Sequence, residues 1–279
     1  MNIDVYSVSD CRILIDRINK TLNTLKPNVL KNIKLYPHSC QRSDSDILEG
    51  LSKAILSRQA TWSSIQNILQ PLKIDLCNYN INTVATLTDS YMTSLYTKYK
   101  SQVKARFLED ELFSIRDNAK IFQHIIIKHG SVCNLISSHL NNSAYDNANN
   151  CYVRAKADSL IKCFTDPISN YKLRNVRLSI CCEFFNNIGI DEFKPDAHTI
   201  RFFNKINLDQ TKIKVSQRQK DVRQIGITIA DTLTESRKYI DSVIWIFCAE
   251  YQGAICTKSK PQCSQCYLKT QEPQLCKGN

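Results

Sequence analysis

The chain has 279 residues, of which 43% are hydrophobic, and a formal net charge of +11. This length and composition exclude intrinsic disorder and predict a large core divided between two lobes. No uninterrupted apolar run is long enough to cross a membrane, so no membrane association is expected. The excess of positive charge favours a polyanionic partner, most simply nucleic acid, although solvated lysine-rich surfaces are common.

The thirteen cysteines would suggest disulfides if the protein were a small secreted domain. The first ten residues, MNIDVYSVSD, show no signal-peptide pattern of a basic region followed by an apolar one. We therefore expect free thiols and a cytoplasmic protein, associated with the nucleoid if the source is bacterial.

Helical periodicity dominates the chain, and its six glycines leave little material for the tight turns of a β-rich fold. Ser43 or Asp44 can cap a first helix, which ends before the turn Ser57 to Thr61. A second helix starts near Trp62, which we expect to pack into the core, and stops at Pro71. Further helices are expected at 83–99, 101–128, 131–140, 152–164, 173–188, 196–206, 216–234 and 237–251.

Two boundaries in the second half of the chain carry specific expectations. Segment 141–150, NNSAYDNANN, is predicted to be an Asn-rich loop. A helix should begin after the Asn175 turn and end at Asn187, with Gly189 closing it as a C-cap residue. Asp196 stands at the start of the next helix, where a carboxylate accepts hydrogen bonds from free backbone N–H groups.

Four cysteines near the C-terminus, Cys256, Cys263, Cys266 and Cys276, have the spacing C-x6-C-x2-C-x9-C. Four thiolates can bind an iron–sulfur cluster. A structural zinc site usually has two close C-x2-4-C pairs. Because only one such pair is present, the spacing favours the cluster, with zinc or no metal as the alternatives.

Several motifs follow one another in a fixed order over residues 44 to 276. These are a Gln59-Ala60-Thr61 turn, a short basic turn before an amphipathic helix, an Asp196-x-His198-x-x-Arg201 element and the four-cysteine loop. This order resembles the helix-hairpin-helix DNA glycosylase superfamily, particularly iron–sulfur members such as endonuclease III and the adenine-mismatch glycosylases. The resemblance implies an all-α, two-lobed fold. It places a six-helix lobe with a modified hairpin at 46–190 and a cluster lobe at 1–45 plus 191–279.

The resemblance also implies roles for individual residues. Asp196 matches the catalytic aspartate, which stabilises the oxocarbenium-like sugar as the glycosidic bond breaks and assists the attack of water. We expect His198 to support the helix start and Arg201 to make an ion pair. Gln59 matches the residue that fills the gap left by an extruded base, the alternative being an ordinary polar loop residue.

The cysteine loop is then expected to hold a 4Fe-4S cluster. Its ligands would be Cys256, Cys263, Cys266 and Cys276, with Cys248 as an alternative to Cys276 because the last spacing is longer than usual for the family. Lys258 and Lys260 would reach the DNA backbone from this loop.

The basic turn departs from the family pattern, because the stretch Lys172 to Leu178 contains no glycine. Capture of phosphate by backbone N–H groups is therefore in question. We expect DNA contacts from side chains of this turn instead, which would steepen the salt dependence of binding. The residues concerned are Lys172, Arg174, Asn175 and Arg177.

Bifunctional members of the family carry a nucleophilic lysine about eighteen residues before the catalytic aspartate. That count reaches Leu178, which cannot form an imine, and the neighbouring Arg177 stays protonated. Lys172 is the alternative nucleophile if the alignment is shifted. The chain is thus predicted to be monofunctional, with water as the nucleophile.

The predicted activity is that of a monomeric DNA glycosylase that flips a damaged, mismatched or modified base out of double-stranded DNA and hydrolyses its N-glycosidic bond. The product would be an abasic site. A hypermodified base of invading viral DNA is a further substrate hypothesis, which would make the protein an antiviral enzyme. A non-catalytic DNA-binding module and a redox-sensing iron–sulfur regulator remain as alternatives.

Overall fold

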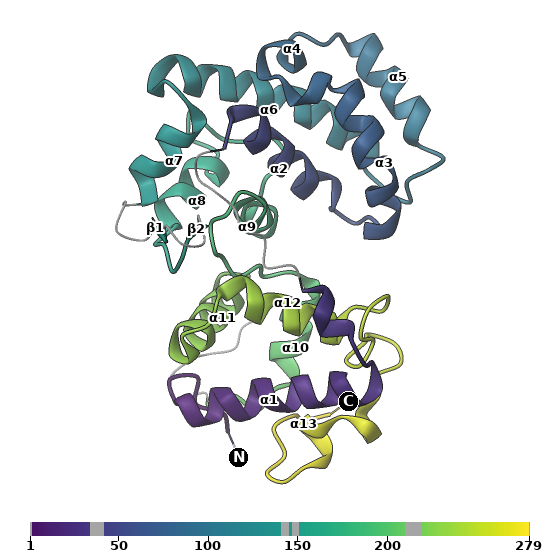
Figure 1. The fold of residues 1–279 in the computed structure, drawn as a ribbon, viewed down its shortest axis with the longest axis vertical. Coiled ribbons are helices and arrows are strands. Elements are labelled where there is room, and N and C mark those ends of the chain that lie inside the picture. The colour runs from purple at the N-terminus through teal and green to yellow at the C-terminus, as the bar shows by residue number, and fades with distance from the viewer. Residues whose placement is uncertain (1, 34–41, 141–144, 147–150, 210–218, 279) are drawn as a thin grey trace. The chain divides into compact units, whose positions relative to one another are not determined.

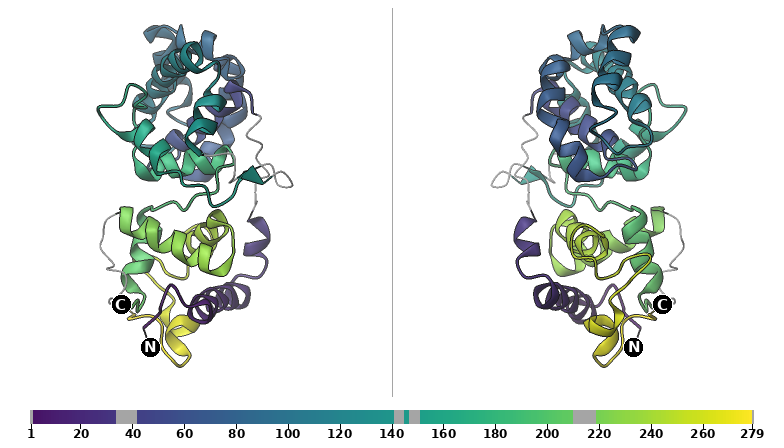
Figure 2. Two further views of the ribbon diagram at one scale, coloured as in Figure 1. Left: turned by 90° about the vertical axis from the view of Figure 1, so that its left-hand side faces the viewer. Right: turned by 90° about the vertical axis from the view of Figure 1, so that its right-hand side faces the viewer.

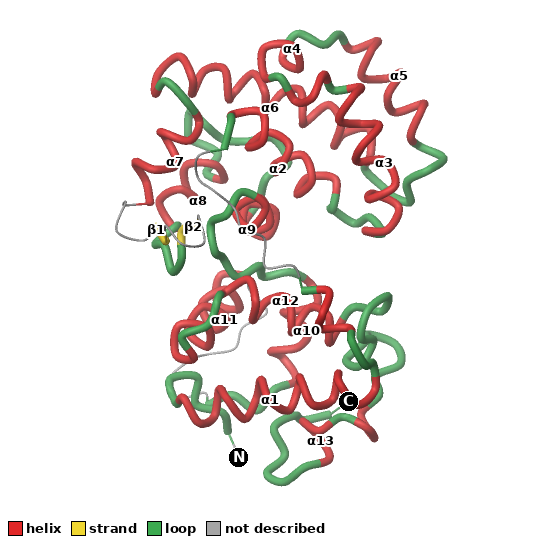
Figure 3. Tube along the Cα trace, viewed as in Figure 1, coloured by secondary structure: helices red, strands yellow, loops and turns green. Residues whose placement is uncertain are grey.

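The computed structural model of the protein describes residues 2–33, 42–140, 145–146, 151–209 and 219–278. In this part of the chain the regular secondary structure is helical apart from one pair of two-residue strands, as Figures 1 and 3 show. The all-α prediction is therefore confirmed. Most of the predicted loop at 141–150 lies outside the described residues. The chain divides into two compact units, unit 1 with residues 1–36 and 191–279 and unit 2 with residues 37–190.

Unit 2 is built on α6, which packs against α2, α4, α5 and α7 around one continuous apolar core. Its elements are α2 (Asp44–Leu56), α3 (Trp62–Asp75), a 3-10 turn (Cys77–Tyr79), α4 (Ile81–Ala85), α5 (Asp89–Tyr99), α6 (Leu108–His129), α7 (Val132–Leu140), β1 (Tyr145–Asp146), β2 (Cys151–Tyr152), α8 (Asp158–Thr165) and α9 (Leu178–Asn187). The predicted boundary at 45/46 falls inside α2. The described part of the unit carries eight α-helices, so the prediction of six was wrong.

Two local features change the bounds of the expected helices between residues 83 and 128. The expected helix 83–99 is two helices, because Thr88 accepts a hydrogen bond from the N–H of Tyr91 and starts α5 there. The expected helix 101–128 begins only at Leu108, since the preceding turn places Ala105 in a bridge with Ala60.

Helix α3 continues through Pro71, so the expected stop at that residue was wrong. Proline removes one helical hydrogen bond. Leu72 beyond it is fully buried, and Leu76 just after the helix is too. Burying a leucine side chain contributes about 1.5–3 kcal/mol, enough to offset the lost bond.

The N-terminal cap of α2 and the C-terminal end of α9 follow the sequence predictions. Ser43 caps α2 in a reciprocal pair with Asp46. Gly189 has a φ of 87° after α9, and the N–H of Ile190 donates to the carbonyl of Phe185 at 2.9 Å. This pattern is a Schellman motif, so the predicted C-cap role of Gly189 is confirmed.

Unit 1 has its own core, with α1 packed against α11, α12 and α13. Figure 2 shows α1 beside the short α13. The elements are α1 (Val8–Leu25), a 3-10 turn (Val29–Asn32), α10 (Ala197–Lys205), α11 (Gln219–Leu233), α12 (Arg237–Cys248), a 3-10 turn (Cys263–Gln265) and α13 (Tyr267–Thr270). The N-terminal helix α1 was not among the expected elements.

The segment that leads into α10 is fixed by three consecutive residues. Asp191 accepts hydrogen bonds from the backbone N–H groups of Arg237 and Lys238 and so caps α12. Glu192 is fully buried and forms an ion pair with Arg223 of α11. Phe193 lies against Gly226, where an added Cβ would stand 2.3 Å from the ring. This segment therefore anchors the start of α10 to α11 and α12.

Among the described residues, no helix combines the length and the apolar character that crossing a membrane requires.

Candidate functional site

Asp196 is the N-cap of α10, as the sequence predicts. Its Oδ1 accepts hydrogen bonds from the backbone N–H groups of His198 at 2.7 Å and of Thr199 at 3.1 Å. The side chain of Thr199 completes a capping box by accepting from the N–H of Asp196. The second carboxylate oxygen, Oδ2, makes no hydrogen bond to the described residues. One oxygen of this half-buried carboxylate is thus fixed by the helix, and the other has no hydrogen-bond partner among the described residues.

His198 and Arg201 connect α10 to the start of the cysteine loop. Arg201 donates from Nη2 to the carbonyl of Cys248 at 3.0 Å and from Nε to the carbonyl of Cys256 at 3.2 Å. Its Nη2 also lies 3.2 Å from Nδ1 of His198, which must act as the acceptor because arginine only donates. Burial lowers the pKa of His198, which favours the neutral ring that this contact needs.

The predicted ion pair of Arg201 was therefore wrong, since its partners are two carbonyls and an imidazole. The backbone N–H of His198 donates to the carboxylate of Asp196 at the helix start, whereas its ring contacts Arg201. The two ends of the loop that precedes Cys256 are held to the same helix that Asp196 starts.

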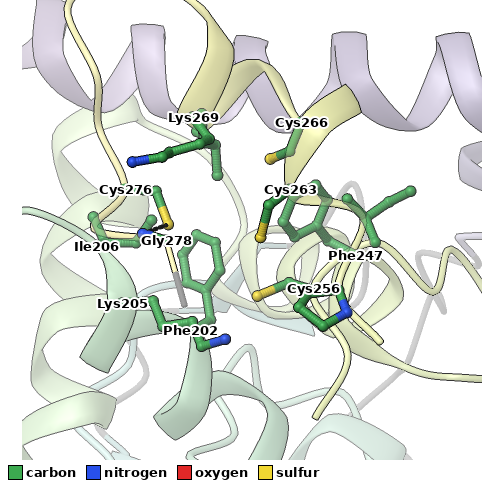
Figure 4. Close-up of a pocket in the computed structure, with 13 residues that line it drawn as sticks. Phe202, Lys205, Ile206, Phe247, Cys256, Cys263, Cys266, Lys269, Cys276 and Gly278 are labelled. Atoms are coloured by element: carbon green, nitrogen blue, oxygen red, sulfur yellow. Dashed lines mark hydrogen bonds between the residues drawn. The ribbon is translucent and has the colours of Figure 1, made fainter. Parts of the chain in front are cut away.

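The four predicted metal ligands line one cavity in unit 1, and Figure 4 shows their sulfur atoms facing it. The rest of the wall is mainly apolar, with Phe202, Phe247, Ile255 and Leu268. In the described part of the chain no group of three or more Cys, His, Asp or Glu is arranged to hold a metal ion. The four cysteines therefore share one cavity wall, and their arrangement does not by itself define a metal site.

Cys276 reaches this cavity despite the nine-residue interval before it. Ile206 forms an antiparallel bridge with Cys276 just after α10, and the N–H of Lys277 donates to the carbonyl of Lys205 at 2.9 Å. Helix α13 occupies the first part of the interval. Arg17 of α1 binds the carbonyls of Gln271, Glu272 and Pro273, at 3.2, 2.9 and 2.6 Å. The segment between Cys266 and Cys276 is therefore held in place by defined contacts. Arg17, which supplies three of them, was not predicted from the sequence.

The thiols differ in their electrostatic surroundings. A hydrogen bond from Cys248 lowers the pKa of Cys256 to about 7, and Lys205 and Arg201 add to this effect. Burial raises the pKa of Cys266 to about 11 and raises that of Cys276 as well. Cys248 itself is completely buried, which raises its pKa, and it does not line the cavity. The Cys248 thiol donates a hydrogen bond to Cys256, and Cys276 lines the cavity with the other three cysteines whereas Cys248 does not.

Lys258 and Lys260 are exposed in the loop between the first two of these cysteines. Thr257 is buried beside them and its Oγ1 accepts a hydrogen bond from the backbone N–H of Lys260 at 3.2 Å. The loop thus presents both ammonium groups to solvent from an ordered backbone.

Gln59 lies in unit 2, in the turn between α2 and α3, and its side chain is exposed. Its φ of 52° is in the left-handed region, which is uncommon for a residue other than glycine. Trp62, at the start of α3, has 36% of its surface exposed, so the prediction that it packs into the core was wrong. A polar amide and an aromatic ring are therefore exposed three residues apart, and the ring of Trp62 can stack on a base.

Arg58, directly before Gln59, is held by two acidic residues of α6. Its Nη2 lies 3.1 Å from Oδ2 of Asp110, and its Nε lies 3.2 Å from Oε1 of Glu111. Glu111 is fully buried and its Oε2 has no partner among the described residues. Burial raises the pKa of Glu111 to about 7, against the effect of Arg58. Glu111 is a second residue that the sequence did not single out.

The basic turn before α9 is held on the same helix. Asn175 donates from Nδ2 to Oδ2 of Asp110 and to Oγ of Ser114, both at 2.6 Å. Arg174 forms ion pairs with Asp110 and Asp117. Asp110 therefore joins the turn that carries Gln59 to the turn predicted to contact phosphate.

Lys172 and Arg177 differ in orientation. Lys172 is half-buried and donates to the carbonyls of Leu173 and Val176, so its ammonium group lies under the turn. Burial lowers its pKa, with a further contribution from Arg177. Arg177 is exposed and forms no ion pair with the described residues. Leu178, the position of the family lysine, is the first residue of α9.

Asp110→Ala should speed hydrogen exchange in both turns, roughly two- to fivefold, since exposed ion pairs contribute about 0.2–1 kcal/mol. Exchange measured by mass spectrometry over residues 57–61 and 172–178 checks this expectation. Asp117→Ala is the matched control, because it removes a partner of Arg174 and leaves Arg58 paired. Faster exchange in only one turn of the Asp110 variant would show that Asp110 does not couple them.

Comparison of the chain with models of protein families, with curated proteins and with solved structures finds no match, so the assignment of a function depends on the residues of the chain itself.

Proposed function

We propose that the protein is a monofunctional DNA glycosylase with a helix-hairpin-helix architecture, which flips a base and hydrolyses its N-glycosidic bond. The observation that carries the proposal is the carboxylate of Asp196, with one oxygen fixed by the N-terminus of α10 and the other free of described partners. A carboxylate so held can stabilise positive charge on the sugar without reorganising during the reaction.

Asp196 would act on the nucleotide in two ways. Its negative charge stabilises the oxocarbenium-like sugar while the bond to the base lengthens, and its oxygen accepts a proton from the attacking water. The base leaves with the bonding electron pair, and the water oxygen bonds to C1′. The products are the free base and an abasic site.

The absence of strand-cleaving lyase chemistry is part of the proposal. A lyase needs an uncharged amine that can attack C1′. Leu178 has no amine, and the ammonium of Lys172 is engaged with two carbonyls of its own turn. Water is therefore the nucleophile in the proposed reaction.

Binding of DNA is assigned to exposed groups of each unit. In unit 2 these are Gln59 as the residue that replaces the flipped base, and the turn from Lys172 to Arg177 as the phosphate contact. In unit 1 they are Lys258 and Lys260. The net charge of +11 is consistent with a polyanionic ligand.

A 4Fe-4S cluster fits the cavity of the cysteine loop better than zinc. Zinc holds its sulfur ligands at about 2.3 Å from a single centre, whereas each cysteine of a cluster binds its own iron and the four sulfurs surround the cluster. The four cysteines line one cavity and include only one C-x2-C pair, which supports the cluster over a structural zinc. When bound, the cluster would cross-link the segment from Cys256 to Cys276 and need not react with the substrate.

A panel of duplexes that carry damaged, mismatched and hypermodified bases tests the activity. Release of free base, detected by mass spectrometry, should occur on at least one duplex. The abasic strand should stay intact until alkali is added, as expected without lyase activity. Salt-sensitive duplex binding without any base release would instead support the non-catalytic module, and affinity controlled by cluster oxidation would support the redox regulator.

A further inference from the structure

The first three cysteines of the cavity are held by contacts within one stretch of chain, residues 247–266. The N–H of Cys256 donates to the carbonyl of Phe247 in the last turn of α12, at 2.9 Å. The N–H of Gln262 donates to the carbonyl of Ile255 at 2.8 Å. A 3-10 turn follows directly and joins the second cysteine to the third. The spacing of these three is therefore set by contacts of short range in the sequence.

Cys276 comes from a different segment, and Figure 4 shows it apart from the other three cysteines, across the cavity. Helix α13 ends at Thr270, and residues 271–275 lead back toward the end of α10. Residues 272–274 are exposed, and Leu275 is the residue of this return segment that lies in the core. The path of the segment before Leu275 therefore depends on polar contacts.

Arg17 of α1 makes those contacts. Its Nη1 donates to the carbonyls of Gln271 at 3.2 Å and of Pro273 at 2.6 Å, and its Nη2 donates to the carbonyl of Glu272 at 2.9 Å. The guanidinium is planar and permanently charged, and hydrogen bonds from a charged donor are stronger than neutral ones. One side chain thus fixes three consecutive peptide groups of the return segment.

Helix α1 also holds the start of α13. Oγ1 of Thr21, one helical turn after Arg17, accepts a hydrogen bond from the N–H of Tyr267 at 3.1 Å and donates to the carbonyl of Arg17 at 2.7 Å. Nζ of Lys20 lies 4.8 Å from the centre of the Tyr267 ring. The same face of α1 therefore binds the chain on entry to α13 and on its return.

We infer that Arg17 is a positioning residue of the cysteine cavity, whose guanidinium binds the carbonyls of residues 271–273 and so places Cys276 opposite the other three thiols. A nine-residue interval can follow many paths, and these hydrogen bonds select one of them. The inference deepens the proposed function, since it makes α1 part of the site that would hold the cluster.

The rate at which each thiol of the metal-free full chain reacts with iodoacetamide tests the inference, with the modified peptides quantified by mass spectrometry. Arg17→Met keeps the apolar stem and removes the guanidinium. Alkylation of Cys276 should become about fivefold faster, because three charge-assisted hydrogen bonds are lost, whereas Cys263 should keep its native rate. Arg17→Lys should give an intermediate rate at Cys276, since an ammonium group lacks the planar fork.

Arg12→Met is the matched control, because Arg12 is exposed on the same helix and its removal costs the same charge. This variant should alkylate at native rates. After reconstitution, a chelator should remove iron from Arg17→Met about fivefold faster than from the native chain, the same factor as for the exposure of Cys276.

An unchanged rate at Cys276 in Arg17→Met, an equal acceleration at Cys263, or the same acceleration in Arg12→Met would each overturn the inference. Equal acceleration at both thiols would mean that Arg17 supports the unit as a whole. If the native chain took up no iron, the cluster of the proposed function would fail, while the alkylation rates of the metal-free chain would still decide whether Arg17 places Cys276.

Discussion

Asp196→Asn should reduce base release by at least about a hundredfold while duplex binding stays within a factor of about two. The amide keeps the shape of the carboxylate but loses the negative charge that the oxocarbenium-like sugar requires. Asparagine is as good an N-cap as aspartate, so α10 should keep its start and the protein its stability. Single-turnover rates on a duplex that the native protein processes, with anisotropy for binding, measure the two effects separately.

Asp46→Asn is the control for this substitution. Asp46 also belongs to a capping box, at the start of α2, but no catalytic role is assigned to it. It should release base at the native rate. Full activity of the Asp196 variant would show that another group supplies the charge, and equal losses in both variants would point to a general effect of removing a capping carboxylate.

The sequence predicts those features of the fold that are set by residues close together in the chain. The caps of α2 and α10 and the Gly189 end of α9 are local, because each depends on residues within one helical turn. Helix α1 has an equally local signal that was overlooked. Ser7 caps it, and its buried residues recur at helical spacing, at Cys11, Leu14, Ile15, Ile18 and Leu22.

Other features depend on partners far away in the sequence. Continuation of α3 through Pro71 depends on the burial of Leu72 and Leu76, which propensity alone does not show. Arg201 binds carbonyls about fifty residues later, and Arg17 binds carbonyls at the opposite end of the chain. No spacing rule predicts a side chain that binds backbone carbonyls of a distant loop.

The roles of the cations in the basic turn also could not be predicted from the sequence, because they depend on contacts formed in the fold. From the sequence, Lys172, Arg174 and Arg177 look equivalent, as three cations in one short stretch. The acids that pair with Arg174 lie on α6, and Lys172 donates to two carbonyls of its own turn. Only Arg177 is left exposed without an ion-pair partner among the described residues. Charge in a sequence predicts the partner, but the division of roles comes from packing.

The second large effect is expected on metal content and stability when a cysteine of the loop is replaced. Serine at Cys256, Cys263, Cys266 or Cys276 should each lower the iron and labile sulfide recovered after anaerobic reconstitution from about four atoms of each per chain to less than half of that. The melting temperature of the reconstituted protein should fall by several degrees in each variant, because a bound cluster stabilises the folded loop. Metal analysis and thermal unfolding measure these outcomes without any dependence on enzymatic activity.

Cys248→Ser, at the end of α12 just before the loop, is the matched control. Cys248 is buried behind Cys256 and donates a hydrogen bond to it, and a serine hydroxyl can replace that donor. This variant should retain nearly all of its iron. If it lost iron as completely as Cys256→Ser while Cys276→Ser retained it, Cys248 would be the fourth ligand. Zinc in place of iron in the native protein would contradict the presence of an iron–sulfur cluster.

Loss of the cluster should also weaken DNA binding through Lys258 and Lys260, because Arg201 binds the carbonyls of Cys248 and Cys256 and so connects this loop to α10. The Asp196→Asn variant, in contrast, should keep its DNA binding.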